Sequence, residues 1–227
     1  MSENILEKQL FEIIKDKEMA EHIKLAKLDM LIKLGVDVNA MYGAKSALML
    51  ANEVKEEKIA KFLEENGAKE FFDEEIAKEL GKKLIEVCAN GEKKDVKELI
   101  DMGADVNQKD KDGKTALIVT VFRGNKEAAE VLIQKGANVN LQDKYGWTAL
   151  MNASHEGDKE IVELLIQNGA DINAENNDGW TALMSASTRN HKEIVKLLIQ
   201  NGVNINPNQN QTTTLCECMA CGKRFSI

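Results

Sequence analysis

A five-residue string recurs along this chain at a fixed interval of 33 residues. Its first copy reads Gly-Ala-Asp-Val-Asn, and the copies begin at Gly103, Gly136, Gly169 and Gly202. A second string, Gly-x-Thr-Ala-Leu, keeps the same interval, and its copies begin at Gly113, Gly146 and Gly179. Such self-similarity is typical of stacked units, each of which buries its apolar face only against its neighbours. The sequence therefore predicts a repeat architecture.

Each unit is predicted to form a turn followed by two short helices. Asp143–Gly146 is a turn sequence in which glycine supplies a positive φ, and Thr148 stands where a helix N-cap belongs. A first helix then stops at Gly157, and a second helix over 159–167 carries a broad apolar face and ends at Gly169. The neighbouring units have Thr115 and Thr181 at the cap, and Gly124 and Asn190 at the first helix end.

These motifs resemble the ankyrin repeat family, whose units run through D-x-x-G-x-T-P-L-H-x-A and close on G-A-D-V-N. The match is clearest over residues 104–206. The proline of the family pattern is replaced by alanine, as at Ala149, and its histidine by an apolar residue, as at Met151. The resemblance implies an all-α fold, an ankyrin-repeat solenoid of stacked helix-turn-helix units joined by β-turn or hairpin-like loops.

The remaining sequence predicts one domain over 1–227. Apolar spacing before Gly35 predicts two helices that form an amino-terminal cap, with charged residues on its outward face. More degenerate units follow, one of them around Leu84 to Gly103. The predicted parts are a cap over 1–36, degenerate repeats over 37–104, regular repeats over 105–206 and a truncated carboxy-terminal repeat over 207–227.

Composition limits the partners and the location. The chain has 30 Lys and Arg against 38 Asp and Glu, a net charge of -8, and neither half is basic. A nucleic-acid partner is therefore not expected, because phosphate binding needs a cationic stripe, whereas a basic protein partner is favoured. No signal sequence or membrane-spanning run is recognised. The expected protein is a cytoplasmic monomer.

The sequence offers one candidate metal or redox cluster, Cys216-x-Cys218-x-x-Cys221. A closed zinc site needs four ligands, no histidine follows His191, and Cys88 lies several units away. Packing of these thiols is therefore the preferred interpretation, with neither metal nor cofactor expected. A metal- or redox-responsive role stays as an alternative.

No catalytic motif is present. The histidines His22, His155 and His191 lie far apart in the repeat register, and no phosphate-binding glycine loop or H-E-x-x-H string occurs. We therefore expect a non-catalytic protein that binds another protein, and an inhibitor that neutralises a cognate toxin is one alternative.

By resemblance to the family, contacts are expected from the finger-like turns and from the first-helix side of the concave face. The implied contact set is Lys111, Asp112, Lys114, Phe122, Arg123, Tyr145, Trp147, His155, Glu156, Asp178, Trp180, Thr188 and Arg189. Trp147 and Trp180 are the chain's only tryptophans and lie 33 residues apart. They are interpreted either as interface anchors or as rings that stack on each other and stiffen the turns.

Overall fold

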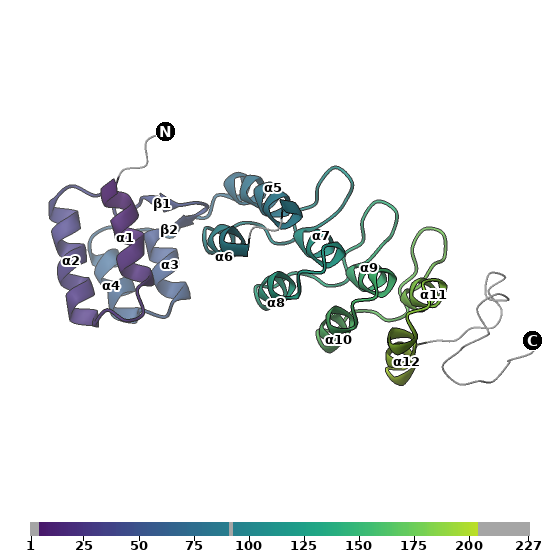
Figure 1. The fold of residues 1–227 in the computed structure, drawn as a ribbon. Helices are drawn as coiled ribbons and strands as arrows, with labels where there is room; N and C mark the ends of the chain where they lie inside the picture. The colour runs from purple at the N-terminus through teal and green to yellow at the C-terminus, as the bar shows by residue number, and fades with distance from the viewer. Residues whose placement is uncertain (1–4, 91–92, 204–227) are drawn as a thin grey trace, which may run out of the picture. The chain divides into compact units, whose positions relative to one another are not determined.

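The computed structural model describes residues 5–90 and 93–203, which form mainly short helices (Figure 1). The chain divides into two compact units. The first comprises Met1–Leu80 with Asp101–Ala104, and the second comprises Gly81–Ile100 with Asp105–Ile227.

The first unit contains four helices and a short hairpin before α5 begins. Its elements are α1 (Ile5–Lys15), α2 (Glu21–Lys33), β1 (Met41–Tyr42), β2 (Lys45–Ser46), α3 (Ala47–Glu53) and α4 (Glu57–Glu65). The hairpin is antiparallel and pairs Met41 with Ser46. The two helices predicted before Gly35 are confirmed, and Gly35 has the positive φ, 87°, expected after a helix end. Their role as a cap stays a prediction.

The core of the first unit lies between α1 and the helices that pack around it. Leu10 and Ile14 from α1, Leu28 from α2 and Leu63 from α4 are almost fully buried. Lys24 of α2 is also buried, at 1% exposure, and its Nζ lies 2.5 Å from Glu56 Oε1. The lysine stem thus fills the core while its charge is paired.

The second unit is a stack of helix pairs. Its helices are α5 (Glu74–Asn90, from Gly81 onward), α6 (Lys93–Asp101), α7 (Ala116–Phe122), α8 (Lys126–Gln134), α9 (Ala149–Glu156), α10 (Lys159–Gln167), α11 (Ala182–Thr188) and α12 (Lys192–Gln200). The first helices α7, α9 and α11 pack side by side, and each packs on the second helix of its own repeat (Figure 1). The predicted solenoid of stacked helix pairs is confirmed.

The predicted helix boundaries are also confirmed. Thr148 Oγ1 accepts a hydrogen bond from Met151 N at 3.2 Å, and Thr115 and Thr181 cap α7 and α11 in the same way. Gly124, Gly157 and Asn190 have positive φ values of 68°, 86° and 62° at the ends of the first helices. Local turn and cap chemistry therefore sets the length of each helix.

One helix differs from the regular pattern. The sequence places a degenerate repeat around Leu84 to Gly103, but α5 already begins at Glu74 and runs for 17 residues. Gly81 leaves room on this helix for the loop that follows α6, because a Cβ on Gly81 would lie 2.6 Å from Gln108 Cβ. The long helix is thus compatible with the stack only through this glycine.

Adjacent repeats are joined by the asparagines that end the Gly-Ala-x-Val-Asn strings at Gly103 and Gly136. Asn140 Nδ2 donates to Gly169 O at 3.0 Å, and Asn140 Oδ1 accepts from Asp171 N at 2.8 Å. Asn107 makes the same pair of bonds one repeat earlier, and Asn39 makes it within the first unit. The recurring asparagine therefore connects one loop to the next.

We expect Asn140→Ala to lower the free energy of unfolding by about 1–2 kcal/mol, because two hydrogen bonds between repeats are lost. Urea denaturation followed by circular dichroism measures the change. Asn168→Ala is the control, since Asn168 Nδ2 donates only within its own helix, to Leu164 O. An equal loss in both variants would contradict a linking role for Asn140.

Candidate partner-binding surface

We call the turns over 110–114, 143–147 and 176–180 the fingers. In the middle finger, Asp143 Oδ1 accepts hydrogen bonds from Tyr145 N and Trp147 N, both at 2.9 Å. Asp143 N also donates to Trp147 O at 3.0 Å, which closes the turn. Asp110 and Asn176 make the equivalent bonds in the other two fingers. Each finger is therefore fixed by the short polar side chain of its first residue.

Neighbouring fingers are hydrogen-bonded to each other through the backbone. Lys144 N donates to Asp112 O at 2.9 Å, and Asn177 N donates to Tyr145 O at 3.1 Å. The approach is so close that a Cβ on Gly146 would lie 2.6 Å from Asn177 N. With φ at 82°, Gly146 is also in the left-handed region. The fingers are thus a connected row rather than separate loops.

In two of the three fingers, the last residue reaches the end of the first helix that follows it. The rings of Trp147 and His155 make an edge-to-face contact, with centroids 5.7 Å apart. One repeat earlier, Lys114 Nζ lies 6.0 Å from the centroid of the Phe122 ring. Among the described residues, the Trp147 ring thus contacts the ring of His155 and not that of Trp180. The backbone contacts stiffen the fingers instead.

Two histidines meet across a repeat boundary. Arg189 Nε lies 3.2 Å and Arg189 Nη2 lies 2.7 Å from His155 Nε2, so the guanidinium donates to this ring nitrogen. His191 Nε2 lies 3.0 Å from His155 O, and the His191 ring fills the space beside Gly157. The expectation that these histidines lie far apart was wrong, because the end of one first helix lies beside the next repeat's helix junction.

The fingertips carry an ion pair. Lys144 Nζ forms a salt bridge with Asp112 across two fingers and lies 5.0 Å from the centroid of the Tyr145 ring. The hydrogen bond from Lys144 lowers the pKa of Asp112 below its ordinary value. The hydrogen bonds that Lys144 makes with Asp112 and with Tyr145 raise the pKa of Lys144. Both side chains reach solvent, so the pair orients them more than it stabilises the fold.

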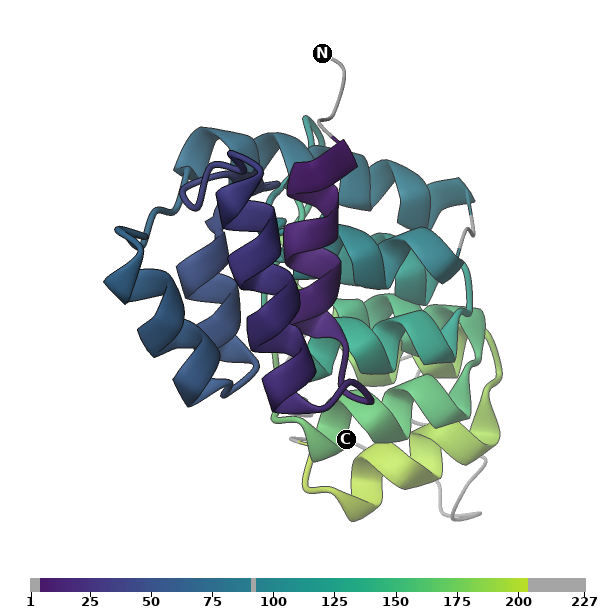
Figure 2. The same cartoon turned by 90° about the vertical axis from the view of Figure 1, so that its left-hand side faces the viewer.

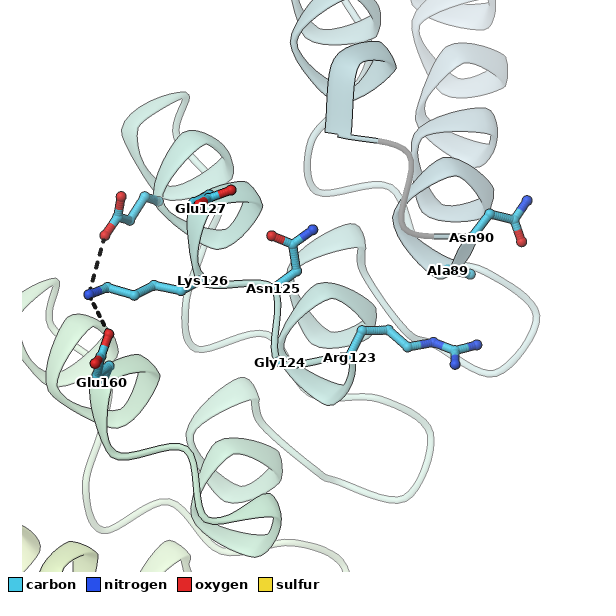
Figure 3. A pocket seen from close by; sticks show the side chains of 9 residues that line it. Ala89, Asn90, Arg123, Gly124, Asn125, Lys126, Glu127 and Glu160 are labelled. Atoms are coloured by element: carbon cyan, nitrogen blue, oxygen red, sulfur yellow. Dashed lines mark hydrogen bonds and ion pairs between the residues drawn. The ribbon is translucent and has the colours of Figure 1, made fainter.

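A polar depression lies where α7 turns into α8, and Arg123 of the predicted contact set is among its lining residues (Figure 3). Its volume is about 790 Å³, and Lys126 crosses it to reach Glu160 at 2.8 Å and Glu130 at 3.9 Å. The ion pair lowers the pKa of Glu160 and raises that of Lys126. No serine, cysteine or histidine lines it among the described residues.

A comparison with protein families fits this arrangement of fingers and helix pairs. The family described as ankyrin repeats (3 copies) matches residues 84–176 and 150–226. The chain belongs to the ankyrin repeat family. The matched residues include all three fingers and more than half of the chain. A search of the curated proteins finds no match.

Ankyrin repeats generally mediate protein–protein interactions, which is the broad class of function expected from the sequence. The repeats are typically non-catalytic, and no catalytic family matches the chain. Within the described part of the chain, no helix is both long and apolar enough to cross a membrane.

The ankyrin contact set implied by the sequence lies on the fingers and the first helices. Its side chains fall into an exposed group and a half-buried group. The exposed group is Lys111, Phe122, Arg123, Tyr145, Glu156, Asp178, Thr188 and Arg189. The half-buried group is Asp112, Lys114, Trp147, His155 and Trp180. The structure brings together Lys114 with Phe122, and Trp147 with His155 and Arg189. Their use in binding stays a prediction.

The predicted contact set omits Lys144 and His191, which contact its members in the structure. Lys144 stands 33 residues after Lys111, so the repeat register alone places it on a fingertip. His191 carries no comparable signal, because its contact with His155 depends on how the side chains pack between repeats.

Of the four cysteines, one lies within the described residues and three lie outside them. Cys216, Cys218 and Cys221 lie outside the described residues, so their predicted packing stays untested. Cys88 is a free buried thiol, and burial raises its pKa. No group of three or more His, Cys, Asp or Glu suited to a metal ion occurs in the ranges 5–90 and 93–203.

Proposed function

We propose that this protein is a non-catalytic binding module that contacts a protein partner through the fingers and the exposed ends of α7, α9 and α11. We call this the finger surface. The observation that carries the proposal is the backbone hydrogen bonding between neighbouring fingers, which holds their side chains in one continuous row. Side chains that are already fixed lose little freedom on binding, so more of the contact energy contributes to affinity.

Aromatic side chains supply the expected anchors. Phe122 and Tyr145 are 54% and 57% exposed, and Trp147 and Trp180 are half-buried at the finger bases. Partly buried aromatic residues beside arginine are frequent hot spots, because a partner can complete their desolvation with little ordering cost. Arg189, held by His155, lies in the same region.

The charges favour a partner that is basic overall but presents both signs at the contact. The chain's net charge of -8 attracts a basic protein at long range. The predicted contact set itself carries four cationic and three acidic side chains. Long-range attraction thus favours a basic partner, whereas local pairing favours a partner surface that carries charges of both signs.

The test is recovery of partner proteins from an extract of the source organism. We expect the double substitution Trp147→Ala and Trp180→Ala to reduce recovery at least about tenfold. The melting temperature should change little, since both rings lie outside the helical core. The control is Glu163→Ala with Lys196→Ala, on the second helices α10 and α12.

Quantitative mass spectrometry of the recovered proteins and thermal melting of each variant separate the outcomes. Loss of recovery in the tryptophan variant alone supports the finger surface. A large fall in melting temperature with unchanged recovery would show that the tryptophans are structural, and equal loss in the control would move the interface to the second helices.

A further inference from the structure

An open groove runs between α1 and α2 in the first unit. Its volume is about 410 Å³, and its lining comes only from these two helices and their connecting loop. Figure 2 shows the two helices side by side, with no other helix of this unit in front of them. The groove and the finger surface share no residue, so its role is independent of the proposed function.

The apolar residues that line each wall of the groove are spaced so that they share one face of a helix. Leu6 and Ile13 lie seven residues apart on α1. Lys27 and Met30 on α2, with Leu34 at its C-cap, follow an i, i+3, i+7 pattern. Residues at this spacing share one face of a helix. The groove therefore presents two parallel stripes, which is the shape that receives further helices.

The apolar stripe on α2 differs from what was expected of a cap. The sequence predicts charged residues over the outward face of the first two helices, but Met30 and Leu34 are 62% and 57% exposed. In a helical stack each pair buries its apolar faces against its neighbours. α3 and α4 cover one side of this pair, and the groove marks a side that no described element of the unit covers.

Opposite charges stand on the two walls. Glu12 lines the α1 wall and Lys27 lines the α2 wall, and both are exposed. Neither forms an ion pair with any described residue. A surface with an acid on one wall and a base on the other is complementary to itself after a two-fold rotation.

We propose that a second copy of this chain covers the groove, so that α1 and α2 of two subunits form an antiparallel four-helix bundle. With the two-fold axis along the groove, each α1 packs on the α2 of the partner subunit. Glu12 then faces the partner subunit's Lys27, and the contact occurs twice. Met30 and Leu34 become buried between the subunits. The monomer expected from the sequence is thereby replaced by a dimer.

Sedimentation velocity of the full chain tests the proposal. We expect the wild-type protein to sediment with twice the 25.2 kDa chain mass at high micromolar concentration. Glu12→Lys and Lys27→Glu each place like charges at both contacts, so each should raise the dimer dissociation constant about tenfold or more. Lys8→Glu is the matched control, because Lys8 is exposed on α1 outside the groove and its replacement should leave the constant unchanged.

Charge exchange makes the test specific. A one-to-one mixture of the Glu12→Lys and Lys27→Glu chains pairs opposite charges at both contacts, so it should form heterodimers tighter than either homodimer. The chain with both substitutions should regain the wild-type constant. A wild-type protein that stays monomeric at every concentration would overturn the proposal, as would a dimer that none of the groove substitutions weakens, or single-variant losses that neither exchange restores.

Discussion

Leu165→Ala is expected to lower the free energy of unfolding by about 3 kcal/mol. The Leu165 side chain is fully buried on α10, and that helix packs against α8, α9 and α12. Truncation removes apolar contacts and leaves a cavity that the surrounding helices cannot fill without separating from one another. Urea unfolding monitored by circular dichroism gives the change.

Leu164→Ala is the matched control for this experiment. It makes the same chemical change one residue earlier on α10, where the side chain is only half-buried. Because less surface is removed from contact, we expect about half the loss or less. Equal losses at the two positions would contradict the packing of α10 against its three neighbouring helices.

Gly146→Ala is expected to lower the free energy of unfolding by about 2–4 kcal/mol. A residue with a Cβ is strained at the φ of 82°, and the new methyl would lie 2.6 Å from Asn177 N. The finger must therefore move, which breaks the hydrogen bond from Asn177 N to Tyr145 O. Denaturation gives the energy, and amide exchange at Asn177 reports the lost bond.

Gly179→Ala separates the two causes. Gly179 stands in the equivalent place with a φ of 77°, but a Cβ there meets no described atom within 4 Å. We therefore expect only the backbone strain, about 1–2 kcal/mol. If both substitutions lower the free energy of unfolding equally, the close approach of neighbouring fingers is not the reason that position 146 needs a glycine.

The features that could be predicted from the sequence are those decided within one repeat. Thr148 caps α9 and Gly157 ends it because a cap and a left-handed residue act on neighbouring backbone. The 33-residue period then sets which helices stack, since identical units bury identical faces. The fold class followed from these two facts.

Features decided between repeats could not be predicted in the same way. The bonds from Asn140 to the next loop and from Arg189 to His155 join residues about one repeat apart, and they depend on side-chain directions that spacing does not give. The groove between α1 and α2 was missed because charged residues alternate with Met30 and Leu34 along the sequence, which hides the apolar stripe.

The candidate site shows the same division. Resemblance to ankyrin repeats placed Trp147 and His155 on one surface, but only the structure shows their rings in contact. The sequence left open whether the tryptophans stack on each other, and the stiffness of the fingers comes instead from backbone bonds such as Lys144 N to Asp112 O. Residue type indicates the candidate anchors, whereas backbone geometry explains how the fingers that carry them are held.

Site-specific photo-crosslinking tests the central claim most directly. A photoreactive amino acid is placed at Tyr145 on a fingertip, at Phe122 at the end of a first helix, or at Glu163 on the second helix α10, and each protein is irradiated in an extract of the source organism. We predict that positions 145 and 122 yield the same protein adduct and that position 163 does not. An adduct formed at position 163 and absent from the other two would contradict the finger surface.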